Sequence, residues 1–365
     1  MRRQRGQPPL LAAITLAGKG DGIAVVGTLL HGALIAGWGS ECHAVTMFDG
    51  AAQLPGFRHK VRFATTLARE IVLRRPEWIL ANHLGLLKAL GAVPVAVRPP
   101  HAVFLHGIEA WRELTATELR WVSRARVRLS NSRYTARRVA ERNPGVGPIV
   151  ACPLALPPSR LPRPAEPSAR ASEIGAHAVL VVGRVSSAER YKGHDVLLAA
   201  WPLVRARVPA AQLIFAGGGD DVDRLRAAGS DNVLGGSVHV LGFVADEELE
   251  LLYRRAACFA LPSTGEGFGL VYLEAMARGL PCVALADSAA ADIIVDGVTG
   301  CLIADQKPEP LAAALVDLLE HPDRRAVMGA AGRARVEAEF TQSHFERRAI
   351  AALAAAFGPP PSRAS

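Results

Sequence analysis

A glycine-rich segment, residues 263–281, places two glutamates eight residues apart around the start of an expected helix. Glu266 stands just before this helix and Glu274 inside it, so at 1.5 Å per residue their carboxylates are predicted to lie about 12 Å apart along the axis. Gly267 and Gly269 leave the backbone N–H groups at the helix entrance bare, and such groups bind anions. The segment therefore offers, in order, a carboxylate that accepts from hydroxyls, an anion site and a second such carboxylate. This order suits a ligand made of a sugar, a diphosphate and a ribose.

Two cations upstream of this segment are candidates to neutralise a diphosphate. Arg184 and Lys192 flank a strand-to-helix loop, where Arg offers a planar fork of donors and Lys a compact charge. Arg190 lies in the same loop and is a secondary candidate. Solvated loop cations are the alternative interpretation, so the assignment depends on the glutamates downstream.

Turns without bulky side chains at the ends of expected strands add backbone groups to the candidate ligand-binding residues. Gly217 and Gly218 belong to a triple-glycine turn, and Val244 follows the next strand, where it can offer backbone groups to a nucleobase. In the first half of the chain, Gly20 and Gly22 form a glycine turn between a strand and a helix. A single turn of this kind is weak evidence for a phosphate site.

His106 ends an apolar strand in the first half of the chain, at the place where a bound ligand is expected. Parallel sheets bind ligands at the carboxyl ends of their strands, which makes the imidazole a catalytic candidate. A structural role for this histidine remains the alternative.

The elements that must position these residues form two runs of alternating strands and helices. Such alternation predicts an α/β protein with two doubly wound parallel sheets. The expected strands of the first half are residues 11–17, 43–48, 78–81, 93–97, 102–105 and 127–130. Its expected helices are 23–37, 57–74 and 133–142, the last with Ser132 as N-cap.

The second half repeats this pattern more regularly. Its expected strands are residues 178–182, 212–216, 238–241, 258–261 and 282–286, and its expected helices are 195–208, 221–228, 247–254 and 270–278. Residues 308–357 are rich in Ala and are expected to be almost entirely helical.

Prolines mark the boundary between the two halves. A proline-rich linker over residues 153–170 separates an N-terminal Rossmann-like domain, 1–152, from a C-terminal one, 171–340. The remaining residues, 341–365, are expected to form a helix that crosses back to the first domain, followed by a tail. Two facing sheets of this kind predict a ligand cleft between the domains.

Composition and charge narrow the class of protein. Of the 365 residues, half are apolar, which excludes a disordered chain. Residues 1–150 hold 21 Lys and Arg against 9 Asp and Glu, a net of +12, while the rest of the chain is at −4. A basic half indicates an anionic partner, such as a membrane surface, a nucleic acid or a phosphorylated substrate.

The five cysteines are far apart and form no C-x-x-C pair, which favours reduced thiols in a cytoplasmic protein. The apolar run after the basic N-terminus is short and leads into the glycine turn, so we expect a buried strand there rather than a signal peptide. No run of residues reaches the length of a membrane-spanning helix.

Taken together, these motifs resemble the retaining glycosyltransferases of family 4, also called glycosyl transferases group 1. The resemblance rests on residues 263–281, the Arg184 and Lys192 pair, the triple-glycine turn and residues 292–300. It is specific over roughly residues 178–340 and looser over residues 10–150. The family has the GT-B fold of two facing Rossmann-like domains.

The resemblance implies a role for each matching residue. Glu266 is expected to hold the hydroxyls of the donor sugar, and Glu274 those of the ribose. Arg184 and Lys192 are expected to neutralise the leaving diphosphate, and His106 to lie against the transferred sugar. The other donor-binding residues implied are Gly20, Gly22, Gly217, Gly218, Val244, Gly267, Phe268, Gly269 and Leu270.

The chain departs from the family pattern at three places. The Gly20-Asp-Gly22 loop differs from the usual glycine-rich form, the insert between Arg184 and Lys192 lacks the commoner proline-containing sequence, and Asp292 stands where many members carry Glu. Asp221-Val-Asp223 copies a metal-diphosphate signature of another glycosyltransferase fold. Because Asp is favoured at helix starts, we interpret it as helix capping and expect no metal.

The motifs and this resemblance together imply a metal-independent hexosyltransferase, retaining as the family is, that uses a nucleoside-diphosphate sugar and no other cofactor. The expected acceptor is a saccharide or lipid-linked hydroxyl in polysaccharide or glycolipid biosynthesis. The basic first domain favours a peripheral site on the inner membrane face over nucleic acid. Two alternatives remain open: a sugar-nucleotide epimerase of the same fold, and a non-catalytic protein that binds nucleotide sugars or nucleic acid.

Overall fold

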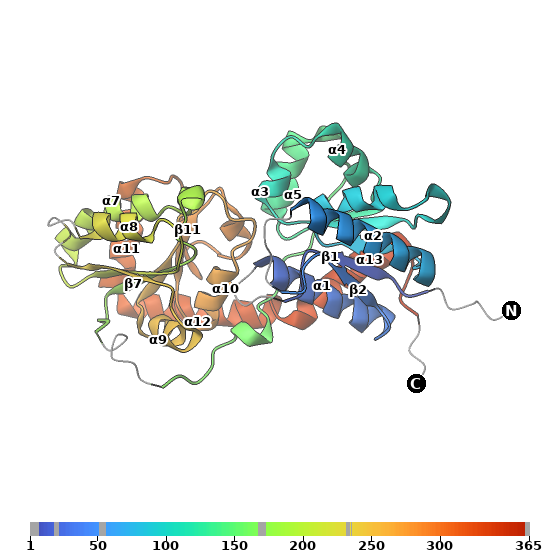
Figure 1. Ribbon diagram of the computed structural model, residues 1–365. Coiled ribbons are helices and arrows are strands. Elements are labelled where there is room, and N and C mark those ends of the chain that lie inside the picture. The colour runs from blue at the N-terminus through green and yellow to red at the C-terminus, as the bar shows by residue number, and fades with distance from the viewer. Residues whose placement is uncertain are drawn as a thin grey trace. The chain divides into compact units, whose positions relative to one another are not determined.

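The computed structural model describes residues 7–17, 22–50, 56–166, 173–230, 234 and 236–361. The chain divides into two compact units (Figure 1). The first unit consists of Met1–Pro157 and Thr341–Ser365, and the second of Pro158–Phe340. The chain therefore leaves the first unit, builds the second, and returns to the first.

The first unit contains a six-stranded parallel sheet with the strand order β2-β1-β3-β4-β5-β6. The strands are β1 (Leu10–Ala13), β2 (His43–Thr46), β3 (Ile79–Ala81), β4 (His101–Leu105), β5 (Val127–Ser130) and β6 (Val150–Ala151). The α-helices are α1 (Gly22–Trp38), α2 (Phe57–Arg74), α3 (Ile108–Trp111), α4 (Ala116–Ser123), α5 (Arg133–Arg142) and α13 (Gln342–Phe357). Three 3-10 helices complete the unit: η1 (Leu84–Ala92), η2 (Val95–Val97) and η3 (Pro144–Val146).

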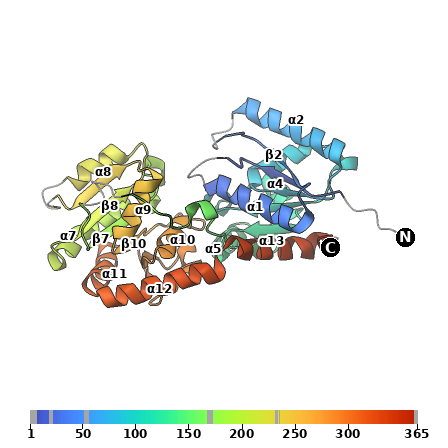
Figure 2. The ribbon, with the colours of Figure 1, turned by 90° about the horizontal axis from the view of Figure 1, so that it is seen from below.

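Alternate residues of the buried strands supply the two faces of this sheet. Leu10 and Ala12 share a core with Phe63 and Leu67 of α2, whose apolar residues recur at helical spacing. On the other face α1 and α13 pack side by side, as Figure 2 shows from below. Both faces are covered, as a parallel sheet requires.

The second unit also contains a six-stranded parallel sheet, ordered β12-β11-β10-β7-β8-β9. The strands are β7 (Ala178–Val182), β8 (Gln212–Ala216), β9 (Val238–Gly242), β10 (Cys258–Ala260), β11 (Cys282–Leu285) and β12 (Gly300–Ile303). The α-helices are α7 (His194–Arg207), α8 (Val222–Gly229), α9 (Asp246–Arg255), α10 (Leu270–Ala277), α11 (Pro308–Glu320) and α12 (Pro322–Glu339). Shorter turns are η4 (Pro158–Arg160), η5 (Ser187–Lys192) and η7 (Ala289–Asp292).

Two doubly wound parallel sheets were predicted, and this is confirmed. The predicted bounds of α2, α5 and β5 agree with the structure, and Ser132 caps α5 by accepting a hydrogen bond from the Thr135 N–H. The strand predicted over residues 93–97 is wrong. Pro94 and the prolines that follow interrupt this apolar run, which turns as η2 with Val95 79% exposed. Strands β6 and β12 were not predicted.

Candidate functional site

The strand order of the second unit fixes where a ligand site can form. Strands β7 and β10 are neighbours although they are far apart in sequence, and the chain winds away from them in opposite directions. This arrangement is a topological switch point, beyond which doubly wound sheets bind their ligands. Arg184 follows β7 and Glu266 follows β10, so both residues lie at this edge of the sheet.

Four charged side chains gather at this edge. Lys192 Nζ lies 3.7 Å from Glu266 Oε1 and 3.2 Å from Glu189 Oε2, and Glu189 Oε1 lies 3.2 Å from Arg184 Nη1. The structure thus brings together Arg184, Lys192 and Glu266, as their predicted roles require. It adds Glu189, which the sequence analysis missed although this residue stands between the two cations in the chain.

Tyr191 ties the Glu266 loop to the Lys192 loop. The Thr264 N–H donates to the Tyr191 carbonyl oxygen (3.0 Å), and a Cβ on Gly265 would lie only 2.3 Å from the Tyr191 ring. Glycine is therefore required for the Glu266 loop to lie flat against this ring. This contact holds the Glu266 carboxylate beside the Lys192 ammonium.

Burial changes the protonation of the groups in this cluster. It raises the pKa of the Glu266 carboxyl, Lys192 lowers that pKa, and Glu189 raises it further. Burial also raises the pKa of Tyr191 to about 12, with smaller effects from Glu189 and Glu266 in the same direction. Desolvation thus favours the protonated form of the Glu266 carboxyl, whereas Lys192 favours the ionised form. Such opposing effects on one carboxyl are common at functional sites.

The triple-glycine turn after β8 packs closely on the turn after β7. A Cβ on Gly217 would lie 1.8 Å from the Gly183 carbonyl oxygen, and one on Gly219 would lie 1.9 Å from that of Val185. Gly218 lies against the backbone and Cβ of Phe243. Gly217 and Gly219 therefore have a packing role, because no side chain fits between the two turns at these positions.

The predicted donor-binding residues around α10 occupy its N-terminal entrance. Gly269 is the N-cap in a left-handed conformation, with φ of 92°, and Leu270 is the first residue of the helix. Phe268 is buried, with its ring centroid 6.2 Å from that of Phe340, so its side chain serves the core. Val244 is buried after β9, and Gly267 precedes the entrance.

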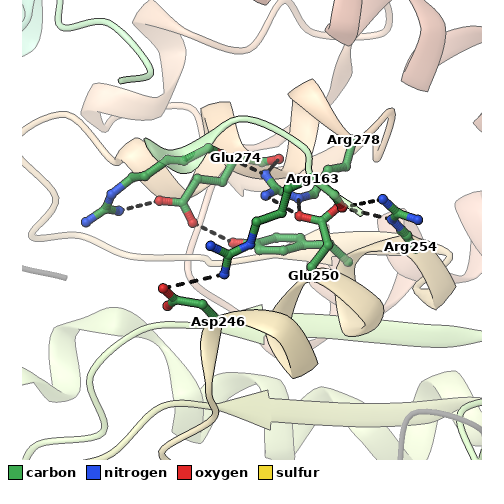
Figure 3. A network of polar contacts seen from close by, with 8 residues as sticks. Arg163, Asp246, Glu250, Arg254, Glu274 and Arg278 are labelled. Atoms are coloured by element: carbon green, nitrogen blue, oxygen red, sulfur yellow. Dashed lines mark hydrogen bonds and ion pairs between the residues drawn. The ribbon is translucent and has the colours of Figure 1, made fainter. Parts of the chain in front are cut away.

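Glu274 lies in a separate network and has no described contact with Glu266. Its Oε1 accepts from Arg160 Nη1, and its Oε2 accepts from the Tyr253 hydroxyl at 3.1 Å (Figure 3). Arg160 comes from η4, in the segment predicted as linker. Neither Arg160 nor Tyr253 was identified from the sequence, since nothing in the chain's local pattern joins positions so far apart.

One geometric prediction rested on a wrong assumption about the helix start, and another is confirmed in position but not in its hydrogen bond. The spacing of about 12 Å between the glutamates assumed helical rise throughout, but α10 begins at Leu270, so Glu266 lies in a loop and Glu274 only one turn inside the helix. Asp221 stands at the N-cap of α8 without a side-chain cap hydrogen bond. Its carboxylate instead accepts from Arg224 at 2.7–2.9 Å, a strong charged pair that outcompetes the cap.

The remaining predicted residues belong to the first unit. His106 follows β4, and its Nε2 donates to the Asn82 carbonyl oxygen, which fixes the ring. Gly22 is the first residue of α1, while Gly20 lies outside the described residues. His83, which the sequence analysis did not identify, lies with its ring centroid 5.7 Å from that of His106.

A cavity of about 450 Å³ opens at the carboxyl edge of the first sheet. It includes Ile14 after β1 and His83 after β3, where the order of the sheet again changes direction. Burial lowers the pKa of His83 to about 4, so the ring is neutral at pH 7. Its Nδ1 accepts from the Gly85 N–H. The rest of the lining is largely apolar, with two lysines: Met47, Lys60, Val61, Phe63, Ala64, Gly85, Leu86, Lys88 and Ala89.

Within the described parts of the chain, no three His, Cys, Asp or Glu side chains are grouped as a metal site would require. Among the same residues, no helix combines the length and the apolar character needed to cross a bilayer.

Comparison with known proteins gives a family model and curated relatives. The model described as Glycosyl transferases group 1 matches residues 176–321. A GDP-mannose-dependent alpha-(1-6)-phosphatidylinositol monomannoside mannosyltransferase of Mycobacterium tuberculosis is 29% identical over 340 residues, covering 83% of this chain and 87% of that protein. A GDP-mannose-dependent monoacylated alpha-(1-6)-phosphatidylinositol monomannoside mannosyltransferase of Corynebacterium glutamicum is 38% identical over 157 residues, 41% of this chain and 40% of that protein.

Solved structures share the fold. Sucrose-phosphate synthase from Thermosynechococcus elongatus superposes with a TM-score of 0.74 at 22% identity, covering 94% of this chain and 97% of that one. Anabaena HepE in complex with UDP and glucose superposes with a TM-score of 0.74 at 18% identity, covering 95% and 99%. The predicted architecture of two Rossmann-like units is the architecture of these proteins.

Proposed function

From the premise that this chain belongs to the group 1 glycosyltransferases of family 4, with the GT-B fold, we propose that it is a mannosyltransferase that uses GDP-mannose. The acceptor is a hydroxyl of a glycolipid. The GDP-mannose dependence of the relatives from M. tuberculosis and C. glutamicum supports the donor, and the lipid acceptors in their names support the acceptor class.

The observation that carries the proposal is the cluster of Arg184, Lys192 and Glu266 at the switch point of the second sheet. Lys192 and Arg184 neutralise the charge that develops on the departing diphosphate, which is the main electrostatic demand of the reaction. Glu266 accepts hydrogen bonds from the hydroxyls of the donor sugar. The backbone N–H groups of Gly267–Leu270, at the entrance of α10, add donors to the phosphates.

The remaining roles follow the same assignment. Glu274 accepts the ribose hydroxyls, and the Gly217, Gly218 and Val244 turns offer backbone groups to the nucleotide. His106 and Gly22 of the first unit remain our candidates for the transferred sugar and the phosphates. The sugar is transferred with retained configuration by attack on the face from which the diphosphate leaves, and this diphosphate accepts the acceptor's proton. No metal takes part, because the two cations supply the charge.

Donor binding gives a direct test of this assignment. We expect GDP-mannose to raise the thermal midpoint of the full chain, and UDP-glucose and ADP-glucose to raise it less. A ligand at about 100 times its Kd adds about 2.7 kcal/mol of stability. Lys192→Ala is the matched control and should abolish most of the shift. A chain that none of the three nucleotide sugars stabilises would contradict the proposed function.

Helix α2 supports an acceptor presented by a membrane. Its inner face is buried, while on the outer face Val61 is 44% and Leu73 is 66% exposed, and the cations Arg58 and Arg69 are exposed on the same side. Apolar and basic side chains on one outer face are typical of helices that lie on anionic lipid. Lys60, in the first turn of the same helix, lines the cavity of the first unit. We place the enzyme on the cytoplasmic face of a membrane.

Charge reversal on α2 tests the membrane proposal. The double variant Arg58→Glu, Arg69→Glu should partition at least about 30-fold less onto vesicles with anionic lipid, since each basic residue near such a surface contributes about 1 kcal/mol. Flotation with phosphatidylglycerol vesicles measures this change. The double variant Arg207→Glu, Arg255→Glu, which reverses two exposed cations of the second unit, is the charge-matched control and should float like the unmodified chain. Equal flotation of both variants, or flotation with neutral vesicles alone, would exclude this surface.

A further inference from the structure

The Glu274 carboxylate is held on both oxygens by groups from different elements. Arg160 of η4 donates to Oε1, and Tyr253 of α9 donates its hydroxyl to Oε2 (Figure 3). Glu274 itself is 6% exposed and Tyr253 is 1% exposed. Two independent donors therefore fix the rotamer of a buried carboxylate before any ligand arrives.

Counting acceptor positions shows what this arrangement leaves available. An ionised carboxylate offers about four lone-pair sites, two on each oxygen. Arg160 takes one on Oε1 and Tyr253 takes one on Oε2, so one site remains on each oxygen. Two acceptor sites on adjacent oxygens match the two neighbouring hydroxyls of a ribose.

We propose that Arg160 is a positioning residue for the ribose of the donor: it orients Glu274 so that the two remaining acceptor sites receive the ribose hydroxyls. This inference rests on the proposed function, which assigns Glu274 to the ribose. Arg160 acts through Glu274 and touches neither the sugar nor the diphosphate. It thereby gives the first residues of the second unit a part in nucleotide recognition.

A second set of contacts holds Arg160 in place. Arg278 Nη1 donates to the Arg160 carbonyl oxygen at 3.2 Å and to the Glu274 carbonyl oxygen at 2.9 Å. Arg278 is in turn bound by Glu250, with Nη2 to Oε2 at 2.6 Å and Nε to Oε2 at 2.9 Å. Because the same guanidinium holds the backbones of both partners, the Arg160–Glu274 pair is fixed at its two ends.

The experiment compares two nucleotides by titration calorimetry on the full chain: GDP, and 2′,3′-dideoxy-GDP, which lacks both ribose hydroxyls. Arg160→Met should weaken GDP binding about tenfold, the loss expected when a hydrogen bond is no longer oriented. It should weaken binding of the dideoxy nucleotide less than about twofold. Arg160→Lys, which keeps the charge, should restore part of the GDP affinity.

Arg163→Met is the matched control. Arg163 lies in the same segment and pairs with Asp246, Nη2 to Oδ2 at 3.4 Å, away from Glu274. This variant should bind both nucleotides like the unmodified chain. In steady state, Arg160→Met should raise the KM for the donor and leave kcat unchanged, whereas a general loss of structure would lower kcat as well.

Three results would overturn the inference, and they are distinguishable. Equal losses for GDP and the dideoxy nucleotide in Arg160→Met would show a structural role only. An unchanged GDP affinity in that variant would remove Arg160 from nucleotide recognition, while leaving the proposed function intact. Failure of the unmodified chain to bind GDP at all would contradict the proposed function, and the inference with it.

Discussion

Replacing Lys192 by Ala is expected to lower turnover by about 10²–10³-fold, the usual effect of removing one group that stabilises developing charge. The Lys192 side chain is only 13% exposed and lies between Glu189 and Glu266, so its charge is little screened by water. Arg184→Ala should act in the same direction and by a similar factor. Its side chain is 66% exposed but reaches the same cluster through Glu189.

Transfer of radiolabelled mannose from GDP-mannose to a glycolipid acceptor measures this effect. Lys307→Ala removes an exposed lysine whose only described ion pair is with Asp305, and should retain full turnover. The loss in Lys192→Ala should fall on kcat as well as on kcat/KM, because the interaction strengthens as the diphosphate leaves. Normal rates in purified, folded Lys192→Ala would refute the assignment of this lysine to the leaving group.

Replacing Glu250 by Ala is expected to destabilise the second unit by about 3–5 kcal/mol, the cost of leaving one buried charge without its partner. Glu250 is 1% exposed and binds Arg278 through Oε2 and Arg254 through Oε1. The Arg278 side chain is 8% exposed and has no other carboxylate partner among the described ion pairs. Its guanidinium also lies over the Tyr253 ring, so it cannot turn out to water without losing that contact.

Chemical denaturation of the full chain, followed by circular dichroism, measures the change. Glu247→Ala removes an exposed carboxylate from the same helix and should change stability by less than about 0.5 kcal/mol. Adding Arg278→Met to Glu250→Ala should recover part of the loss, because both buried charges are then gone. A single variant as stable as the control would show that Arg278 finds another partner.

Local patterns were sufficient to predict most of the fold. The bounds of α2 agree because its apolar residues recur at helical spacing and Pro76 stops it, and Ser132 has the chemistry of an N-cap. The cluster of Arg184, Lys192 and Glu266 could also be predicted, since each residue follows a strand that parallel pairing brings to one edge.

The contacts that the sequence could not reveal are the long-range ones. Arg160 and Glu274 are separated by 114 positions, and no local sequence pattern predicts that their side chains will be in contact. Glu189 was overlooked for the opposite reason: a lone acid between two cations in a loop is common, and only the structure shows that it contacts both. The strand over residues 93–97 was wrongly predicted because an apolar run does not by itself show whether its residues will be buried in a sheet or exposed.

Helix α13 belongs to the first unit but is synthesised after the whole second unit, so the first unit can complete its core only late in synthesis. Phe357 stacks on Trp78 with ring centroids 4.5 Å apart, and α13 packs along α1, so residues 342–357 complete a core that residues 10–157 begin. On the ribosome the second unit is therefore made entirely before the first can close. Until residues 342–357 emerge, the groove beside α1 exposes apolar surface, and a nascent chain in this state is a natural client for chaperones.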